Sequence, residues 1–295
     1  MSNKELNKLL AKADSQFERL YSSKESLILR GYKKALDDVK YEISKAFEKA
    51  SKFPSITELR KFNRLDKLEK EITRIIGEMQ KTETNIINSA KKESIATSYA
   101  NTQQAINTSF AETGLSFSTP ILKESVSAVM TDNLWLDALK GHNTKLLTDT
   151  KIALETVLRT NAREEIVSGL IQGKPYSQVA KAIQARFNVT AGRAKVIAFT
   201  EMHKGHSTGR NDGIKSAMES AERLGFKSKK VWKHNNVGQA RQQHLSMDGK
   251  AADKNGLFHI GGLSAQAPGL FGDPAQDANC HCSALFELEG INQGI

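Results

Sequence analysis

Apolar residues recur at steps of three and four along most of the first 90 residues, and this spacing limits the fold more than any other feature. Such steps place side chains on one face of an α-helix, so they predict long amphipathic helices. The first run predicts a helix that ends near Phe53-Pro54, because proline interrupts helical geometry. The second run predicts a helical hairpin or coiled coil against it. The apolar positions are Leu6, Leu10, Ala13, Phe17, Leu20, Leu27, Ile28, Tyr32, Ala35, Val39, Ile43 and Ala46 in the first run and Leu65, Leu68, Ile72, Ile75, Met79 and Ile86 in the second.

The pattern changes twice further along the chain. Residues 91–113 are rich in Ser, Thr, Asn and Gln and are expected to form a solvated helix, with a boundary near Gly114 to Pro120. Shorter helices are expected from Pro120 to about Gly225, one of them with Thr190 as its N-cap. Residues 229–233 and 283–288 alternate like short strands.

Together these patterns predict a mainly α protein: an elongated N-terminal helical region followed by a small C-terminal α+β module with a few short strands. The expected divisions are residues 1–118 for the elongated helical region, 119–228 for a second helical part, and 229–295 for the strand and loop part.

Basic residues are concentrated in one part of the chain. The whole sequence has 43 Lys and Arg against 33 Asp and Glu, a formal net charge of +10, and residues 181–241 alone carry 13 basic and 4 acidic side chains. This excess predicts non-specific contact with the phosphates of nucleic acid, with an ordinary solvated face as the alternative. The candidate DNA-binding residues are Lys195, Lys204, Arg210, Lys215, Lys227, Lys229, Lys230 and Lys233.

Several classes of protein are disfavoured by the sequence. Charges interrupt every apolar run well before the roughly 18 residues that a membrane-spanning helix needs, so no membrane partner is expected. The first residues do not resemble a secretory signal. The two cysteines, Cys280 and Cys282, are separated by one residue, and a disulfide between them would be strained, so synthesis in a reducing cytosol is expected.

Four stretches of the second half occur in a recognisable order: "GLIQGKPYSQVAKAIQARF", "RAKVIAFTEMHKGHSTGRNDG", "KKVWKHNNVGQARQQHLSMDGK" and "FGDPAQDANCHC". Together they resemble the phage Mu F-like minor head protein family, over roughly Thr144 to Leu288. Phe199 and His281 stand where the family usually has arginine. The residues that match the family's motifs are Thr200, Glu201, Asn211, Trp232, Arg241, His244, Asp248, Gly249, Asp273, Pro274, Asn279, Cys280 and Cys282.

The resemblance implies a minor structural protein of a tailed-phage head. Such a protein would lie in the capsid interior of the virion, associated with the portal protein, after assembly in the host cytoplasm. It would support head assembly or genome packaging and delivery, with the double-stranded genome and the major capsid or scaffolding protein as further partners. The alternative is a metal-dependent nuclease or a toxin-like effector injected with the genome.

Cysteines and histidines near the C-terminus leave three interpretations open. His244, His259, Cys280 and Cys282 have the donor types of a tetrahedral zinc site. Otherwise the cysteines are small buried apolar side chains. The third interpretation joins Arg241, His244 and Asp248 to Glu201 and Asn211 in one buried polar network. No cofactor other than this structural zinc is expected.

No catalytic constellation is evident in the sequence. His203 and His206 lie three apart on a predicted helix, but the His-Glu-x-x-His pattern of zinc peptidases is absent. The zinc deaminase pattern and the phosphate-binding loop of ATP motors are absent as well. The sequence therefore predicts a protein that is not an enzyme, with no catalytic residues.

Overall fold

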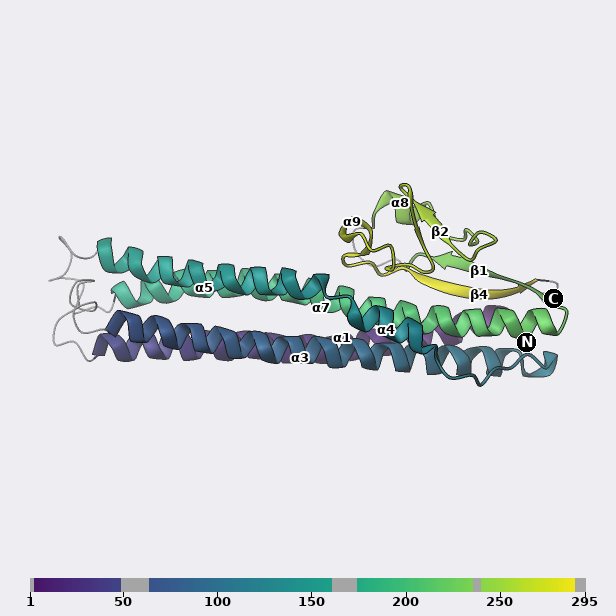
Figure 1. The fold of residues 1–295 in the computed structure, drawn as a ribbon, viewed down its shortest axis with the longest axis horizontal. Helices are drawn as coiled ribbons and strands as arrows, with labels where there is room; N and C mark the ends of the chain where they lie inside the picture. Colours follow the sequence, from purple (N-terminus) through teal and green to yellow (C-terminus); the bar gives the residue numbers. More distant parts are fainter. Residues whose placement is uncertain (1–2, 49–63, 161–173, 236–239, 290–295) are drawn as a thin grey trace. The chain divides into compact units, whose positions relative to one another are not determined.

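The computed structural model describes residues 3–48, 64–160, 174–235 and 240–289 (Figure 1). Helices dominate up to residue 223, and the strands follow, so the predicted mainly α class with a C-terminal α+β module is confirmed. The predicted end of the first helix near Pro54 lies outside the described residues. The helical elements of this part are α1 (Asn3–Glu48), α3 (Arg64–Ser109), the short 3₁₀ helix η1 (Ala111–Thr113), α4 (Lys123–Thr131), α5 (Leu134–Thr160) and α7 (Lys174–Arg223).

The chain divides into two compact units built from non-consecutive segments. Unit 1 combines residues 1–24, 87–133 and 196–295, and unit 2 combines residues 25–86 and 134–195. The consecutive division at residues 118 and 228 remains a prediction about domains.

In unit 2, parts of α1, α3, α5 and α7 lie side by side as a four-helix bundle (Figure 1). Its interior holds one polar cluster, in which the Tyr32 hydroxyl lies 3.2 Å from a Glu83 carboxylate oxygen and 3.1 Å from Asn143 Oδ1. Burial raises the pKa of Glu83 to about 7, although hydrogen bonds from Asn143 and Tyr32 oppose the shift. Because an uncharged carboxyl group is cheaper to bury, this cluster favours the protonated acid at mildly acidic pH.

In unit 1, one face of the polar end of α3 is buried, so the expectation of a solvated helix was wrong for that face. Ser94, Ser98 and Thr102, spaced by four, are at most 2% exposed. They face Gly205, Gly209 and Gly213 of α7, which are also spaced by four. A Cβ added at Gly205 would lie 2.6 Å from the Lys91 carbonyl oxygen, so the two helices approach closely enough that only glycine fits. Small polar residues pack well here because their neighbours have no side chains.

Helix α7 is a single helix of 50 residues, so the expectation of shorter helices was wrong for residues 174–223, whereas α4 and α5 are shorter, with 9 and 27 residues. Thr190 does not cap a helix: it lies inside α7, and its hydroxyl donates to the Arg186 carbonyl oxygen four residues earlier at 3.0 Å. A Ser or Thr hydroxyl makes this bond inside a helix as readily as it caps one, so its presence in the sequence does not locate a helix start.

The C-terminal module of unit 1 contains two antiparallel strand pairs. Strand β1 pairs with β4 in the register Lys227↔Glu289 to Lys233↔Ser283, and β2 pairs with β3. Both predicted strands are thus confirmed. The Phe286 ring of β4 packs edge to face against Phe110, the residue that follows α3, with ring centroids 5.9 Å apart, which joins the strands to the helical core. The elements of the module are β1 (Lys227–Lys233), α8 (Gln242–Leu245), β2 (Phe258–Ile260), β3 (Leu263–Ala265), α9 (Pro274–Asp277) and β4 (Ser283–Glu289).

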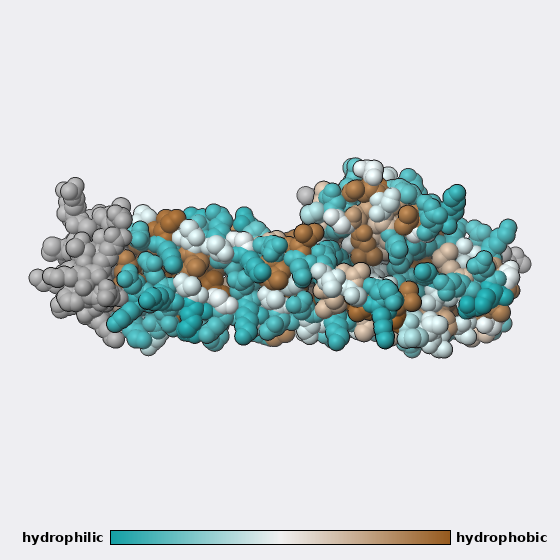
Figure 2. Space-filling model, viewed as in Figure 1, coloured by the Kyte–Doolittle hydropathy of each residue, from teal (hydrophilic) through white to brown (hydrophobic). Residues whose placement is uncertain are grey.

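Hydrophilic side chains cover most of the visible face, with apolar ones interspersed among them (Figure 2). Among the described residues, no helix is both long and apolar enough to cross a membrane. The apolar stripes of the sequence therefore serve the interior: Leu6, Leu10, Ile72 and Ile75, for example, are at most 5% exposed.

Candidate functional site

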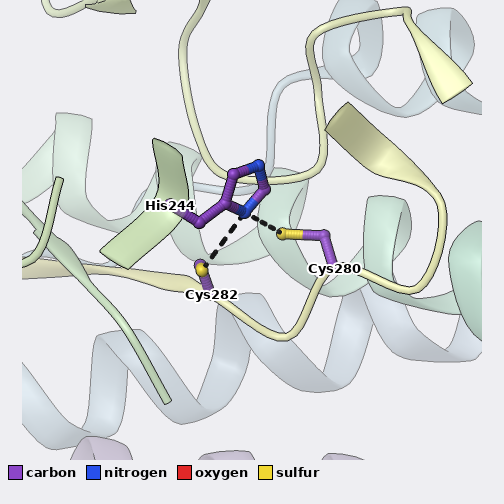
Figure 3. Close-up of side chains that lie close together, drawn as sticks. All are labelled: His244, Cys280 and Cys282. Atoms are coloured by element: carbon purple, nitrogen blue, oxygen red, sulfur yellow. Dashed lines mark hydrogen bonds between the residues drawn. The ribbon is translucent and has the colours of Figure 1, made fainter. Parts of the chain in front are cut away.

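Three of the four predicted metal ligands converge in the C-terminal module. His244 lies on α8, and Cys280 and Cys282 lie in the segment that leads into β4 (Figure 3). The His244 Nδ1 atom is 3.7 Å from Cys280 Sγ and 3.6 Å from Cys282 Sγ. All three side chains are buried, and their donor atoms lie within 4.8 Å of one another. The geometry therefore forms a compact cluster of one nitrogen and two sulfur donors.

The two thiols affect each other's protonation. The hydrogen bond between them lowers the pKa of Cys280 and raises the pKa of Cys282. Burial lowers the pKa of His244, but its interactions with Cys280 outweigh burial and raise the pKa above its ordinary value. The cluster therefore concentrates negative charge on Cys280, beside an imidazole.

Residues of the family motifs hold this cluster in place. Arg241 donates a hydrogen bond to the Ala278 carbonyl oxygen, and Thr200 Oγ1 accepts the Asn279 N–H at 3.1 Å. Asn279 itself has φ +52°, a conformation that asparagine tolerates better than most side chains. Asp273 caps α9 by accepting the Ala275 N–H at 2.6 Å. The loop before Cys280 is thus fixed at several points.

His259, the fourth predicted ligand, lies elsewhere. Its ring bonds Asp253 Oδ2 at 3.0 Å and Ser264 Oγ at 2.9 Å, and its side chain is 57% exposed. The sequence could not place it, because β2 directs alternate residues to opposite faces and His259 lies on the exposed one. The prediction that His259 belongs with His244 and the cysteines was therefore wrong.

The predicted single polar network is divided into separate clusters. Asn211 accepts a hydrogen bond from Lys230 at 2.7 Å, and Asp248 accepts the His234 backbone N–H at 2.8 Å. Glu201 pairs with Lys91 at 2.8 Å, across two helices whose contact no sequence pattern predicted. Each cluster connects a different pair of segments, so the motif residues do not form one continuous polar network.

The Glu201 cluster is a buried set of alternating charges. Lys204 lies 2.9 Å from Glu201 and 2.7 Å from Asp132, while Lys91 and Glu201 are almost completely buried. Burial lowers the pKa of Lys204, but the nearby carboxylates outweigh burial and raise it. This arrangement joins α3, α7 and the segment after α4, and it was missed because nothing in the sequence marks Lys91 as buried.

A second buried cluster joins α1 to α7. Asp14 lies 2.7 Å from Arg210 and 3.1 Å from His206 Nε2. Burial raises the pKa of Asp14, but Arg210 and His206 outweigh burial and bring it down to about 2. Burial lowers the pKa of His206 to about 4, so this histidine is uncharged at neutral pH. The Asp14–Arg210 ion pair therefore connects the two helices, and we assign the cluster a structural role.

The predicted DNA-binding residues do not share one surface environment. Arg210 and Lys230 are buried, at 1% and 6% exposure, and Lys204 belongs to the Glu201 cluster. Lys215 and Lys227 are exposed. The remaining members lie close to carboxylates: Lys195 to Glu25, Lys229 to Glu287 and Glu289, and Lys233 to Asp248.

A surface pocket of about 610 Å³ lies beside Lys230. Its lining includes Lys215 and Lys227 but also Glu219 and Glu222. Burial lowers the pKa of Lys230 to about 8. Because the carboxylates offset the lysines, the pocket does not have the uniform positive charge that would select a phosphate group.

Comparison with known proteins agrees with the resemblance seen in the sequence. Residues 160–285 match the family described as Phage Mu protein F like protein. This range lies within the stretch from Thr144 to Leu288 that the motifs predicted. The chain therefore carries a Mu F-like region, and its resemblance to Mu F-like minor head proteins is confirmed.

Two curated proteins are similar to this chain over different extents. NAD(+)–arginine ADP-ribosyltransferase EFV of Enterococcus faecalis is 33% identical over 135 residues, which cover 46% of this chain and 27% of that protein. Minor head protein GP7 of Bacillus phage SPP1 is 26% identical over 292 residues, which cover 98% of this chain and 86% of that protein. The chain thus spans about a quarter of the first relative and most of the second. No solved structure matches it significantly.

Proposed function

We propose that this protein is a minor structural protein of a tailed-phage head, located inside the capsid at the portal, where it supports head assembly and genome packaging or delivery. The observation that carries the proposal is the similarity to Minor head protein GP7 of phage SPP1 over 98% of the chain. Because that similarity includes the helical half, it extends beyond the Mu F-like region. The long helices supply surfaces for contact with portal, major capsid or scaffolding protein.

Co-assembly with the head proteins tests this function. The protein is co-expressed with the portal and major capsid proteins of the same phage genome, and procapsids are purified by density gradient. We expect it to sediment with procapsids and to be depleted from procapsids assembled without portal. Equal recovery without portal contradicts portal attachment, and absence from both contradicts the head role.

Non-specific contact with the packaged DNA is the second part of the proposal. Lys215 and Lys227 are exposed in the basic segment, where they are accessible to phosphates. Affinity for duplex DNA should fall steeply with salt, because each phosphate contact releases counterions. The double variant Lys215→Glu/Lys227→Glu should bind more weakly with a shallower salt dependence. Lys34→Glu is the control, since Lys34 lies in α1 with its side chain 80% exposed. Unchanged binding by the double variant would contradict this part.

The second candidate function is an effector delivered with the genome. It is favoured by the similarity to the enterococcal ADP-ribosyltransferase, although 73% of that protein lies outside the match. The purified chain is incubated with NAD⁺ and an arginine-containing peptide, and separately with Mg²⁺ and supercoiled plasmid. No turnover above a heat-inactivated sample is expected for a head protein, whereas ADP-ribosylation or plasmid cleavage would favour the effector.

A further inference from the structure

We propose that His244, Cys280 and Cys282 bind one zinc ion, which links helix α8 to the start of strand β4. The inference does not depend on the head role, because it uses only the geometry of these side chains. His244 precedes Cys280 by 36 residues and Cys282 by 38 residues, and the three side chains meet in the hydrophobic core of unit 1.

The spacing of the donor atoms matches tetrahedral zinc. Zinc binds sulfur at about 2.3 Å and imidazole nitrogen at about 2.0–2.1 Å. At the tetrahedral angle, these bond lengths place a nitrogen and a sulfur ligand about 3.6 Å apart. The observed separations of His244 Nδ1 from the two sulfurs are 3.7 and 3.6 Å. The two nitrogen–sulfur separations therefore already match those of a tetrahedral zinc site.

The other side of the His244 ring fixes its tautomer. Its Nε2 atom lies 3.0 Å from Gln276 Oε1, and the Gln276 amide nitrogen donates to Gln243 Oε1 at 2.9 Å. Because the Gln276 amide is oriented by Gln243, its oxygen faces the ring and accepts the Nε2–H. The Nδ1 atom faces the two sulfurs (Figure 3), and in this tautomer it carries the lone pair. Histidine ligands of metals commonly use such an outer hydrogen bond.

The donor set selects among metal ions. Two thiolates and an imidazole suit Zn²⁺, whereas Mg²⁺ and Ca²⁺ prefer oxygen ligands. Both cysteines are thiolates in the bound state, so the zinc–dithiolate group is neutral overall. Neutrality matters here, because all three ligands are at most 3% exposed and a buried net charge would be costly.

In the described part of the chain, three side chains with metal-binding groups make up this cluster, which leaves the fourth position of a tetrahedral site to a non-protein ligand. Both segments that the ion would join also contact neighbouring elements. His203 of α7 lies 3.0 Å from the Cys282 carbonyl oxygen, and the Trp232 ring of β1 packs edge to face on His244 with ring centroids 5.5 Å apart. The ion's role is structural, because it connects two loops across this core.

Metal content of the full-length protein tests the site. The protein is stripped with chelator under reducing conditions, reconstituted with ZnCl₂, desalted and analysed by mass spectrometry of the elements. We expect about one zinc per chain. His244→Ala and Cys282→Ser should each lower the zinc content at least tenfold. His259→Ala is the matched control, a histidine of the same module outside the cluster, and it should retain the metal.

Equal zinc loss in His244→Ala and His259→Ala, or less than a tenth of an equivalent in the unaltered protein, would overturn the proposal. Circular dichroism checks that each variant keeps its helices. If a variant does not fold, Co²⁺ substitution of the unaltered protein decides the question. A thiolate-to-cobalt charge-transfer band together with the visible bands of tetrahedral Co²⁺ supports the site, and their absence overturns it.

Discussion

Gly209 lies at the closest approach of α7 to α3, so replacing it tests whether that contact requires glycine. A Cβ at this position would lie 2.9 Å from Tyr99 N and 3.1 Å from Ser98 Cβ, and closer still to the Ile95 carbonyl oxygen. Ordinary carbon contacts are about 3.5–4.0 Å, so the helices must separate by about 1 Å to admit one methyl group. The obstructing atoms include backbone, which cannot rotate away.

The free-energy change for Gly209→Ala has two opposing parts. Overpacking a tight interface costs about 1–3 kcal/mol, and backbone obstruction favours the upper end. Alanine's better helix propensity returns about 1 kcal/mol. The net expected destabilisation is therefore about 2 kcal/mol. Gly205→Ala should behave similarly, because its obstruction is the Lys91 carbonyl oxygen.

Gly192 provides the matched control, because it lies in the same helix with nothing within 4 Å of an added Cβ. Gly192→Ala should stabilise the protein by up to about 1 kcal/mol. The assay is guanidinium denaturation followed by circular dichroism, with the free energy of unfolding extrapolated to water. If Gly209→Ala proved neutral, or as stabilising as Gly192→Ala, the close helix contact would be refuted.

Three further predictions concern buried polar groups. Glu83→Gln should remove a pH dependence of the free energy of unfolding. Because the pKa of Glu83 is raised in the folded protein, its contribution to stability is complete below about pH 4.5, and up to about 3 kcal/mol of that contribution is lost as the pH rises through about 7. Plots of unfolding free energy against pH for the two proteins should therefore diverge over this range. Lys91→Met should destabilise the protein by less than the roughly 3 kcal/mol of a fully unpaired buried charge, because Lys204 still pairs with Glu201, and Lys91→Met/Glu201→Gln should recover part of that loss in a double-mutant cycle of denaturation experiments. Asp273→Ala should destabilise the protein by about 1 kcal/mol, because it removes the N-cap of α9. Asp273→Asn keeps a capping oxygen and should leave the melting temperature nearly unchanged. Equal shifts of the melting temperature in the two variants would contradict the capping role.

Local patterns predicted the elements whose signals are local. The steps of three and four in α1 and α3 identified long helices, and alternation around Trp232 identified β1. The motif order located the Mu F-like region, which family matching confirmed over residues 160–285. These inferences succeeded because backbone periodicity depends on neighbours a few residues away.

The same reasoning failed where burial contradicts composition. The polar residues Ser94, Ser98 and Thr102 were expected to face solvent, but they are buried opposite glycines more than 100 residues later. The four-residue spacing of Gly205, Gly209 and Gly213 was the available signal. It would have predicted a close helix contact but not the identity of the facing helix.

The sequence alone determined the helical class, the Mu F-like region and the donor types near the C-terminus. Only the tertiary structure decided which donors meet: it joined His244 to both cysteines and placed His259 elsewhere. It also paired Lys91 with Glu201 across 110 residues and His206 with Asp14 across 192. The physical reason is that periodicity is a property of adjacent residues, whereas burial and charge pairing depend on segments that folding alone brings together.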